Sequence, residues 1–464
     1  MYSERARGKI NRRNFLHSAA AAGAGLAISP AALAKTKNNK KPDDINVALL
    51  GAGAEGQVLM NTILKIRNSG VRFKAVCDIW TAYNQKRAAG LLKRYRHPVN
   101  AYVDYENMLA KEKDLDAVII ATPDFWHAPH TIACLEAGLH VYCEKEMSNT
   151  LEGARKMAEA ARKSGKLLQI GHQRRSNPRY RYCYENLING AKLLGTITTV
   201  NGQWNRSRLA CEDLGFPKNA AINEATLKKY GYDSMHQFRN WRWYKGLGGG
   251  PIVDLGSHQI DIYSWFLCTH PKAVMASGGI DYWKPPLCKE THDWYDNVMA
   301  IYEYDLGDRT VRAFYQTITT NSSQGYFENF MGDEGSLLIS EASGRGSVYR
   351  EGWVPPENWE EWVKMGIITE AEKEQEKQEE DSAPDYLLKV KPTPEPPRYE
   401  IPVTMEGKLY HQPHLENFFD AIRGKAELNC PAEVGYATAV AVLKVNEAIE
   451  AERKLTFNPE DFKV

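Results

Sequence analysis

Between residues 45 and 170 the chain alternates short apolar runs with longer segments of helical composition. The first run, residues 46–50, is too continuously apolar for a half-exposed strand and is followed at once by glycine, so we predict a strand covered on both faces. Further strands are predicted over residues 117–121, 140–143 and 167–170, and helices over 81–96, 102–110, 128–137 and 151–164. This alternation predicts a parallel, doubly wound sheet of the Rossmann type.

The pattern changes after Gly171. Strand-like segments rich in β-branched and aromatic residues lie at 196–204, 274–279, 296–304, 310–319 and 336–340. Such runs predict a mostly antiparallel sheet that is polar on one face. Residues 370–397 are charged and then proline-rich, which predicts a surface excursion, whereas 410–423 and 432–453 have the apolar spacing of helices that fold back on the body.

A chain of 464 residues is long enough to bury two hydrophobic cores. We therefore predict an α/β protein with an N-terminal doubly wound domain over residues 35–172 and a C-terminal α+β domain over 173–464. Charge is nearly balanced, with 59 basic and 58 acidic side chains and no basic block. This composition argues against a nucleic-acid partner.

A glycine-rich turn follows the first strand. Gly51, Gly53 and Gly56 form GxGxxG, in which the glycines allow a tight turn, the approach of a pyrophosphate, and close packing of helix on strand. Glu55 lies inside the turn, and the helix that follows offers unpaired N–H groups to a diphosphate. Asp78 ends the next strand 22 residues after Gly56, where a carboxylate binds ribose hydroxyls and repels a 2′-phosphate. The motif predicts NAD rather than NADP; the alternative is an ordinary strand–turn–helix.

Two further candidate segments leave the same edge of the predicted sheet. Residues 122–127 form a loop after a strand, at the position where open α/β sheets bind ligands. Glu144 and Lys145 follow the strand 140–143, so that a lysine is able to reach both a nicotinamide and a substrate hydroxyl. Taken alone, Lys145 is better explained as a solvated surface lysine.

The segment 248–267 predicts a glycine loop that opens a helix with an aligned polar row. Asp254, His258 and Asp261 stand at i, i+4 and i+7, on one face of that helix. A histidine between carboxylates is oriented by one of them and held near the pKa that proton transfer at neutral pH requires. Metal binding and a plain hydrogen-bonded surface row are the alternatives.

With these segments in view, the chain resembles the Gfo/Idh/MocA oxidoreductase family. The resemblance rests on GAGAEG, ATPDFWH, CEK, GHQRRSNP and GGGPIVDLGSHQIDIYSWF, which together cover nearly the whole chain after residue 34. It implies an N-terminal Rossmann domain and a C-terminal α/β domain whose large, open antiparallel sheet often packs against another subunit. We accordingly expect a homo-oligomer, either a dimer or a tetramer.

The resemblance also implies roles for individual residues. The family's Lys-Asp-His set falls on Lys145, Asp254 and His258: His258 exchanges the hydroxyl proton, Lys145 hydrogen-bonds the reacting oxygen, and Asp254 orients both. The family usually has proline where Glu146 stands, so this chain lacks that rigid turn and carries an additional charge beside the lysine. The positions implied to line the cofactor are Thr122, Pro123, Trp126, His127 and Glu144. The substrate-binding candidates are Gln173, Arg175 and Asp261; Arg174 and Arg175 serve equally well as ties between the domains.

The first 34 residues have the features of a twin-arginine signal peptide. Residues 11–17 read NRRNFLH, a short alanine-rich apolar run follows, and Ala32-Leu33-Ala34 is a cleavage site. A membrane anchor and a disordered tail are the alternatives, but the apolar run is too short to span a bilayer well. We expect export to the periplasm, cleavage after Ala34 and no stable membrane insertion afterwards. The eight cysteines contain no C-x-x-C, and we expect no disulfide framework.

These features lead to three hypotheses about the reaction. The first is NAD-dependent hydride transfer at a hydroxyl carbon of a sugar or polyol. The second is an NAD-retaining glycosidase that oxidises a sugar hydroxyl transiently, eliminates the glycosidic substituent, adds water and reduces the ketone again. It is favoured by export, because the periplasm is not expected to supply NAD. The third is an NAD-binding protein without catalysis.

Overall fold

The computed structural model describes residues 43–342, 344–371 and 395–464 of the chain. The predicted signal peptide at 1–34 lies outside the described residues, as does most of the predicted surface excursion at 370–397. Within the described part, the strands form two sheets.

The first sheet has six strands, all parallel, and confirms the predicted doubly wound arrangement. Its order is β3-β2-β1-β4-β5-β6, so the strand before the glycine turn is central. Both β1 and β4 are buried at every position, as expected for strands covered by helices on both faces. The strands are β1 (Ile45–Leu50), β2 (Val71–Cys77), β3 (Asn100–Tyr102), β4 (Ala117–Ile120), β5 (His140–Cys143) and β6 (Leu168–Ile170).

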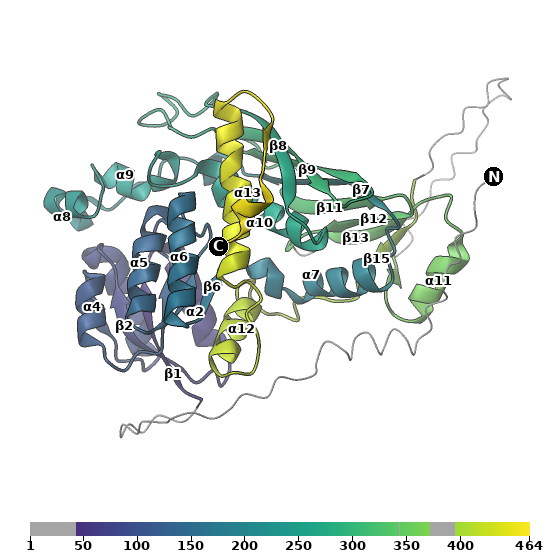
Figure 1. Ribbon diagram of the computed structural model, residues 1–464. Coiled ribbons are helices and arrows are strands. Elements are labelled where there is room, and N and C mark those ends of the chain that lie inside the picture. Colours follow the sequence, from purple (N-terminus) through teal and green to yellow (C-terminus); the bar gives the residue numbers. More distant parts are fainter. Residues whose placement is uncertain (1–42, 343, 372–394) are drawn as a thin grey trace. The chain divides into compact units, whose positions relative to one another are not determined.

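Helices cover this sheet, and one of them comes from the far end of the chain (Figure 1). The core contains Leu59 and Ile63 of α2 together with Leu415 and Phe418 of α12, so the C-terminal segment folds back as predicted. The helices are α2 (Ala54–Lys65), α3 (Lys86–Arg94), α4 (Tyr105–Lys111), α5 (Asp124–Glu136), α6 (Leu151–Ser164) and α12 (Gln412–Ile422), with a π-turn η2 (Thr81–Gln85) before α3.

The start of α5 differs from the sequence prediction. Residues 122–127 were expected to be a loop, but the helix begins at Asp124, with Pro123 in an extended conformation at its N-cap. An acid in the first turn after a proline is a helix-start signal. Trp126 and His127 are therefore held on the first turn of a helix and not on a free loop.

The second sheet has ten strands in the order β14-β15-β13-β12-β11-β7-β10-β9-β8-β16. Its pairs are antiparallel except for β7 with β10, which run parallel, so the prediction of a mostly antiparallel sheet is confirmed. No strand was predicted from the sequence at β11, at β13 or at the three short edge strands β14, β15 and β16. The long strands are β7 (Ile197–Asn205), β8 (Pro271–Gly279), β9 (Asn297–Asp305), β10 (Thr310–Ile318), β11 (Tyr326–Gly332), β12 (Gly335–Ile339) and β13 (Gly346–Arg350). The short edge strands are β14 (Thr369–Glu370), β15 (Arg398–Glu400) and β16 (Leu455–Thr456).

One face of this sheet is covered and the other is open. Burial alternates along β9, and the open face exposes Met275, Met299 and Ile301. The covered face packs against α10 (Gly250–Phe266) and α13 (Ala432–Glu450). Helix α13, yellow in Figure 1, also contacts α6, so it packs against elements of both sheets.

Helix α10 begins in the glycine loop, as predicted for the segment 248–267. Gly250 has φ +79°, a left-handed conformation, and a Cβ there would lie 2.9 Å from Trp294. Pro251 follows within the first turn, where its missing N–H costs no hydrogen bond.

The remaining elements are short. They are η3 (Gln173–Ser176), α7 (Pro178–Tyr182), η4 (Cys183–Gly190), η5 (Arg208–Ala210), η6 (Lys218–Ala220), α8 (Glu224–Lys229), α9 (Met235–Arg239), η7 (Trp241–Trp243), α11 (Pro356–Lys364) and η8 (Pro459–Phe462).

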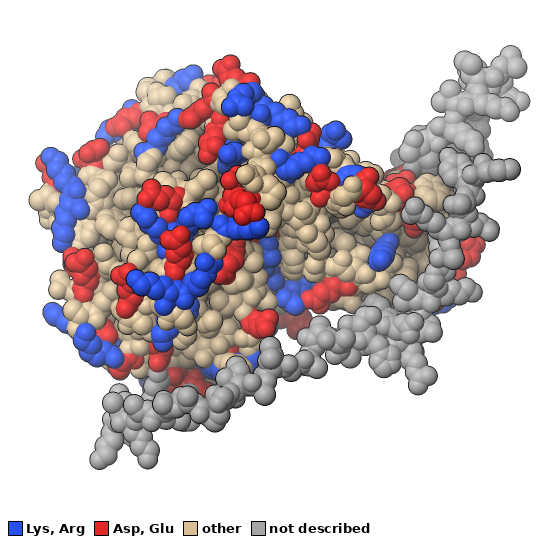
Figure 2. Space-filling model, viewed as in Figure 1, with Lys and Arg blue, Asp and Glu red and all other residues tan. Residues whose placement is uncertain are grey.

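All eight cysteines are free thiols, and only Cys268 is exposed. On the face shown in Figure 2, basic and acidic side chains alternate without a large region of one sign. No helix among the described residues combines the length and apolar character needed to cross a membrane.

Candidate active site

A cavity of about 650 Å³ brings together the glycine turn, the ends of β2, β4 and β5, and the first turns of α10. Gly51 and Asp78 line it beside the turn, and Lys145 and His258 also line it. The segments that sequence analysis singled out separately thus face one space.

The turn has the shape that a dinucleotide requires. A Cβ on Gly51 would lie 2.6 Å from the carbonyl oxygen of Ala121, and one on Gly56 would lie 2.0 Å from that of Gly51. At Gly53 the only atom within 4 Å of such a Cβ is Asn84 Nδ2, at 3.9 Å, so space remains above the turn. No side chain caps the start of α2 at Gly53, which leaves its amides available to a diphosphate.

Asp78 is fixed beside the turn. Its Oδ2 accepts the Ala52 N–H at 2.7 Å and its Oδ1 accepts the Trp80 N–H at 2.7 Å. Burial raises the pKa of this carboxyl to about 6 despite those bonds. Oδ2 also accepts from Asn84 Nδ2 at 3.4 Å, whereas Oδ1 keeps acceptor capacity for a ribose hydroxyl. These residues fit the adenosine and diphosphate parts of NAD.

Most of the predicted residues at the start of α5 line the cavity, but one is buried behind the cavity wall. Thr122, Pro123 and Trp126 line the cavity, as predicted for cofactor contacts. His127 does not: it is 1% exposed, and its ring nitrogens lie 2.7 Å from the carbonyl oxygens of Glu146 and Thr122. The predicted cofactor contact of His127 is therefore corrected, because its ring points into the protein and fixes the neighbouring backbone.

Two acids line the cavity near the turn. Burial raises the pKa of Glu144 to about 8, and the nearby Glu55 adds to this effect. His411, which precedes α12, places its Nε2 3.3 Å from Glu55 Oε1. Single ligand atoms of Glu55, Glu144 and His411 lie within 4.8 Å of one another, the geometry of a possible metal site. The Asp254, His258 and Asp261 row does not form such a group among the described residues.

Lys145 and Asp254 meet across the cavity. The Lys145 ammonium donates to the main-chain oxygen of Asp254 at 2.6 Å and to its Oδ1 at 3.0 Å. Arg242 Nε lies 3.4 Å from the other carboxylate oxygen. Burial alone would raise the pKa of Asp254, but Lys145, Arg242 and Arg206 together lower it well below its usual range. Asp254 is therefore a carboxylate that holds Lys145 in place.

His258 lies one helical turn after Asp254 and is 6% exposed. Its ring centre is 5.1 Å from that of Trp204 and 6.4 Å from that of His172. Its Nδ1 is buried and finds no hydrogen-bond partner among the described residues. Burial, followed by the charge of Lys145, lowers the pKa of His258 well below its ordinary value. The imidazole is neutral at pH 7 and able to accept a proton.

Gln173 reaches the cavity together with Glu341, to which its Nε2 donates at 3.3 Å. Behind them Arg174, 1% exposed, donates to Glu341 at 2.7 Å and forms an ion pair with the buried Glu328. Tyr180 donates to the other oxygen of Glu328 at 2.6 Å. This buried network fixes Glu341 at the cavity wall.

The predicted substrate contacts of Arg175 and Asp261 need correction. Arg175 Nε lies 2.9 Å from each carboxylate oxygen of Asp261, Thr438 of α13 donates to Oδ1 at 2.9 Å, and neither charged residue lines the cavity. Asp261 does share a face with Asp254, but seven residues along a helix amount to roughly 10 Å, which carries it past the cavity. The pair ties η3 to α10 and α13.

Family models match both halves of the chain. The oxidoreductase-family model for an NAD-binding Rossmann fold matches residues 45–172, and that for the C-terminal alpha/beta domain matches 219–457. The chain belongs to the Gfo/Idh/MocA oxidoreductase family. Its N-terminal domain is thus an NAD-binding Rossmann domain.

Curated Gfo/Idh/MocA-like relatives match over part of their length. A scyllo-inositol 2-dehydrogenase (NADP(+)) of Bacillus subtilis is 28% identical over 52% of this chain and 56% of the relative. A D-glucoside 3-dehydrogenase of Escherichia coli is 29% identical over 48% and 54%, respectively. A glycosyl hydrolase family 109 protein of Shewanella baltica is 30% identical over 34% and 38%. The chain thus spans about half the length of the first two relatives, and less of the third.

Solved structures share the fold over almost the whole chain. Levoglucosan dehydrogenase, in complex with NADH and levoglucosan, has a TM-score of 0.64 at 19% identity, covering 89% of this chain and 99% of that one. The WlbA dehydrogenase of Chromobacterium violaceum has a TM-score of 0.62 at 18% identity, covering 90% and 97%. At these identities the likeness shows the common architecture.

Several cavity residues were missed by the sequence analysis. In the C-terminal domain, Arg206 and Glu341 follow strands, Tyr326 is the first residue of β11, and His411 precedes α12. All four line the cavity. No local motif marks them, because they meet the Rossmann residues only through folding.

Proposed function

We propose that this protein is an NAD-dependent oxidoreductase that acts at a hydroxyl-bearing carbon of a sugar or polyol. The observation that carries the proposal is the convergence of Lys145, Asp254 and His258 in the cavity that also contains the glycine turn. A purely NAD-binding protein has no need of a neutral buried histidine beside an anchored lysine.

Each of these residues has a distinct role in the proposed reaction. When bound, NAD supplies the site that accepts or returns hydride. His258 takes the hydroxyl proton, because its imidazole is neutral and it lines the cavity. Lys145 donates a hydrogen bond to the reacting oxygen with an N–H that Asp254 does not use. Asp254 keeps the ammonium oriented, and Thr122, Pro123 and Trp126 line the cofactor's side of the cavity.

The names of the relatives support a cyclic polyol or sugar as substrate. They describe dehydrogenases of an inositol, a glucoside and levoglucosan. Trp204, Trp241 and Trp243 line the cavity and offer faces on which a sugar ring stacks. Trp283, by contrast, is fully buried in the core and is not available.

The second candidate is a redox-neutral, NAD-retaining glycoside hydrolase that uses the same residues. It is favoured by the similarity to a glycosyl hydrolase family 109 protein. The predicted export adds to this, since an enzyme that completes its redox cycle on one sugar needs no external NAD pool.

One experiment separates the two candidates. Purified protein is incubated with aryl glycosides without added NAD, and with free sugars in the presence of NAD. Steady accumulation of NADH on free sugars supports the dehydrogenase and excludes the redox-neutral cycle. Release of aglycone with no net NADH supports the hydrolase. If no member of the panel gives either NADH accumulation or aglycone release, both candidates are contradicted.

Export by the twin-arginine route and cleavage after Ala34 complete the proposal. The supporting sequence is NRRNFLH with Ala32-Leu33-Ala34, and the test is replacement of Arg12 and Arg13 by lysine. Retention of the variant in the cytoplasm supports the route; unchanged periplasmic delivery contradicts it.

A homo-oligomer is also proposed, supported by the apolar open sheet face with Met275, Met299 and Ile301. Light scattering coupled to gel filtration measures the oligomeric state. Met299→Glu should dissociate the assembly, and a monomeric wild-type protein would contradict the proposed homo-oligomer.

A further inference from the structure

Arg206 is a cavity-lining cation that has no ion-pair partner among the described residues. It follows β7 directly, and its guanidinium carbon lies 5.7 Å from the centre of the Trp204 ring. Among the described residues its side chain forms no hydrogen bond or ion pair, although its backbone N–H donates to Ile318. A half-buried guanidinium with open donors facing a cavity is suited to bind an anion.

The surrounding charges favour an anion at the same place. Asp254 feels the positive charges of Lys145, Arg242 and Arg206, so three cations surround one carboxylate. Arg242 uses Nε on Asp254, lies 4.4 Å over the Trp241 ring and lines the cavity.

Two further acids of the cavity wall have cations of their own. Glu341 is paired with the buried Arg174 at 2.7 Å. Glu212 is paired with Arg208 at 3.1 Å. Asp254 and Asp124 interact with Arg242, whereas Arg206 has no ion-pair partner among the described residues, so its positive charge remains for a ligand.

NAD does not account for these arginines. Its diphosphate belongs at the glycine turn and the start of α2, and its adenosine belongs beside Asp78. Arg206 instead lies against Trp204, whose ring is also in contact with His258. The arginine is thus placed at the substrate end of the cavity, one tryptophan ring from the histidine.

We propose that the substrate is an anionic sugar, whose carboxylate, sulfate or phosphate substituent binds Arg206 and Arg242 while its ring lies near Trp204 and His258. This inference deepens the proposed function and rests on it for the identity of the reacting site. Arg206 is then the residue that selects anionic sugars over neutral ones.

The test measures binding and not turnover, so that it is independent of the proposed reaction. Calorimetric titration of the protein saturated with NADH uses D-glucose with D-glucuronate, D-galactose with D-galacturonate, and D-glucose with its 6-sulfate and 6-phosphate. At least one anionic sugar should bind about tenfold or more tightly than its neutral parent, and the preference should fall with added salt. The three glucose derivatives distinguish carboxylate, sulfate and phosphate.

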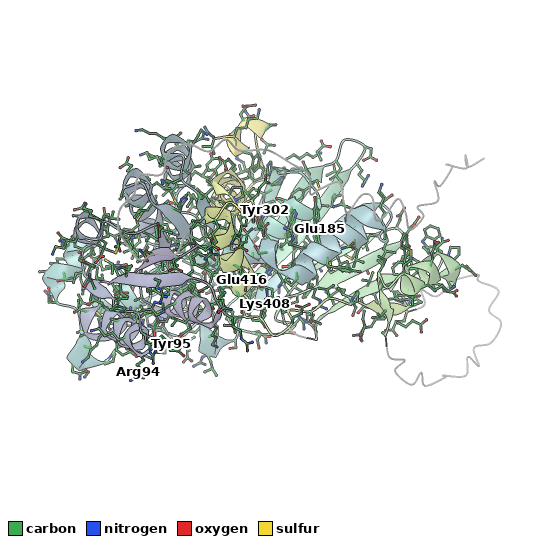
Figure 3. All side chains as sticks on the ribbon, turned by 90° about the horizontal axis from the view of Figure 1, so that it is seen from below. Arg94, Tyr95, Glu185, Tyr302, Lys408 and Glu416 are labelled. Atoms are coloured by element: carbon green, nitrogen blue, oxygen red, sulfur yellow. The ribbon has the colours of Figure 1, made fainter. Side chains whose placement is uncertain are left out.

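Variants of the two arginines test which side chain produces the preference for anionic sugars. Arg206→Gln should reduce the ratio of anionic to neutral affinity by about 10- to 100-fold, and Arg206→Lys should restore part of it. Arg242→Gln should lower the ratio as well. Arg94→Gln is the matched control: Arg94 is exposed in the last turn of α3, at the edge of the view in Figure 3, and should leave the ratio unchanged.

Two results would overturn the inference: no anionic sugar binding more tightly than its parent, or an unchanged ratio in folded Arg206→Gln. Its failure is distinguishable from that of the proposed function. If anionic sugars bind through Arg206 but none is oxidised or hydrolysed, the inference stands and the proposed function fails. If neutral sugars are turned over and anionic ones bind no better, the proposed function stands and the inference about anionic sugars fails.

Discussion

Lys145 and Asp254 join the two halves of the active site directly: the ammonium lies 2.6 Å from the main-chain oxygen and 3.0 Å from Oδ1 of a residue 109 positions later. Lys145 follows β5 of the Rossmann sheet, and Asp254 stands in α10 against the second sheet. The contact sets the position of the lysine relative to His258, one turn further along α10. Catalysis as proposed depends on that relative position.

Removal of either catalytic side chain should abolish turnover without loss of NAD. We expect Lys145→Ala and His258→Ala each to lower the turnover rate by about 10²- to 10⁴-fold, the usual contribution of positioned proton transfer. NAD content, measured by absorbance after denaturation, should match that of the wild type, because the glycine turn and Asp78 are untouched. Lys93→Ala, in the last turn of α3, is the control. Loss of NAD from either variant would show that their roles are misassigned.

The pH dependence of oxidation follows from the neutral state of His258. Burial lowers its pKa well below 6.5, so the unprotonated base persists as pH falls through 6.5. The kcat/KM for sugar oxidation should therefore show no loss from His258 between pH 8 and 6.5, with its acid limb below that range.

Asp124 and Glu144 also line the cavity and are able to imitate such a limb, since burial raises the pKa of Asp124 to about 7 and that of Glu144 to about 8. Asp124→Asn and Glu144→Gln are therefore the controls. An acid limb at or above pH 6.5 that persists in both variants would contradict the assignment of His258 as base.

Two glycines in helices should respond oppositely to alanine. Gly56→Ala places a Cβ 2.0 Å from the carbonyl oxygen of Gly51 and must displace the turn, so NAD binding should be lost or greatly weakened. Gly90→Ala, in α3, meets nothing within 4 Å and should stabilise the protein by about 0.5–1 kcal/mol with NAD binding unchanged. Fluorescence titration with NADH and thermal unfolding measure the two effects. Normal NADH affinity in Gly56→Ala would disprove the close packing described for the turn.

The buried Arg174 network should be more sensitive to loss of the arginine than to loss of one acid. Arg174→Met leaves Glu328 and Glu341 without their cation and should cost about 3–5 kcal/mol in denaturant unfolding. Burial raises the pKa of Glu328 to about 7 even beside Arg174, so a neutral side chain is tolerated there.

Glu328→Gln should accordingly cost less than Arg174→Met at pH 7, and the difference should shrink at pH 5. A folded pKa above the unfolded one means that Glu328 binds its proton more tightly in the native state. Its contribution to stability is therefore present at low pH and lost as pH rises through about 7. Equal costs at both pH values would contradict this account.

The sequence alone identified the parts of the site that depend on local pattern. The turn at Gly51, Gly53 and Gly56 is recognisable because strand, glycines and helix are contiguous, and Asp254 and His258 because one helix carries both. Asp261 was only partly predictable from local pattern. Its helical face follows from the sequence, but its partners Arg175 and Thr438 lie 86 and 177 positions away and are known only from the fold. Arg206 and Glu341 had no local signal, since only the pairing of β7 and β12 with their neighbours brings them to the cavity.

The most direct test of the account is a stopped-flow record at 340 nm after NAD-loaded protein is mixed with sugars and glycosides. Both candidate reactions begin with oxidation of a hydroxyl, so a substrate should produce a rise in absorbance, lasting in the dehydrogenase and transient in the hydrolase. The account predicts this rise for the wild type and its absence for His258→Ala that has kept its NAD. Conversion of a sugar by protein freed of NAD, or at the wild-type rate by His258→Ala, would contradict it.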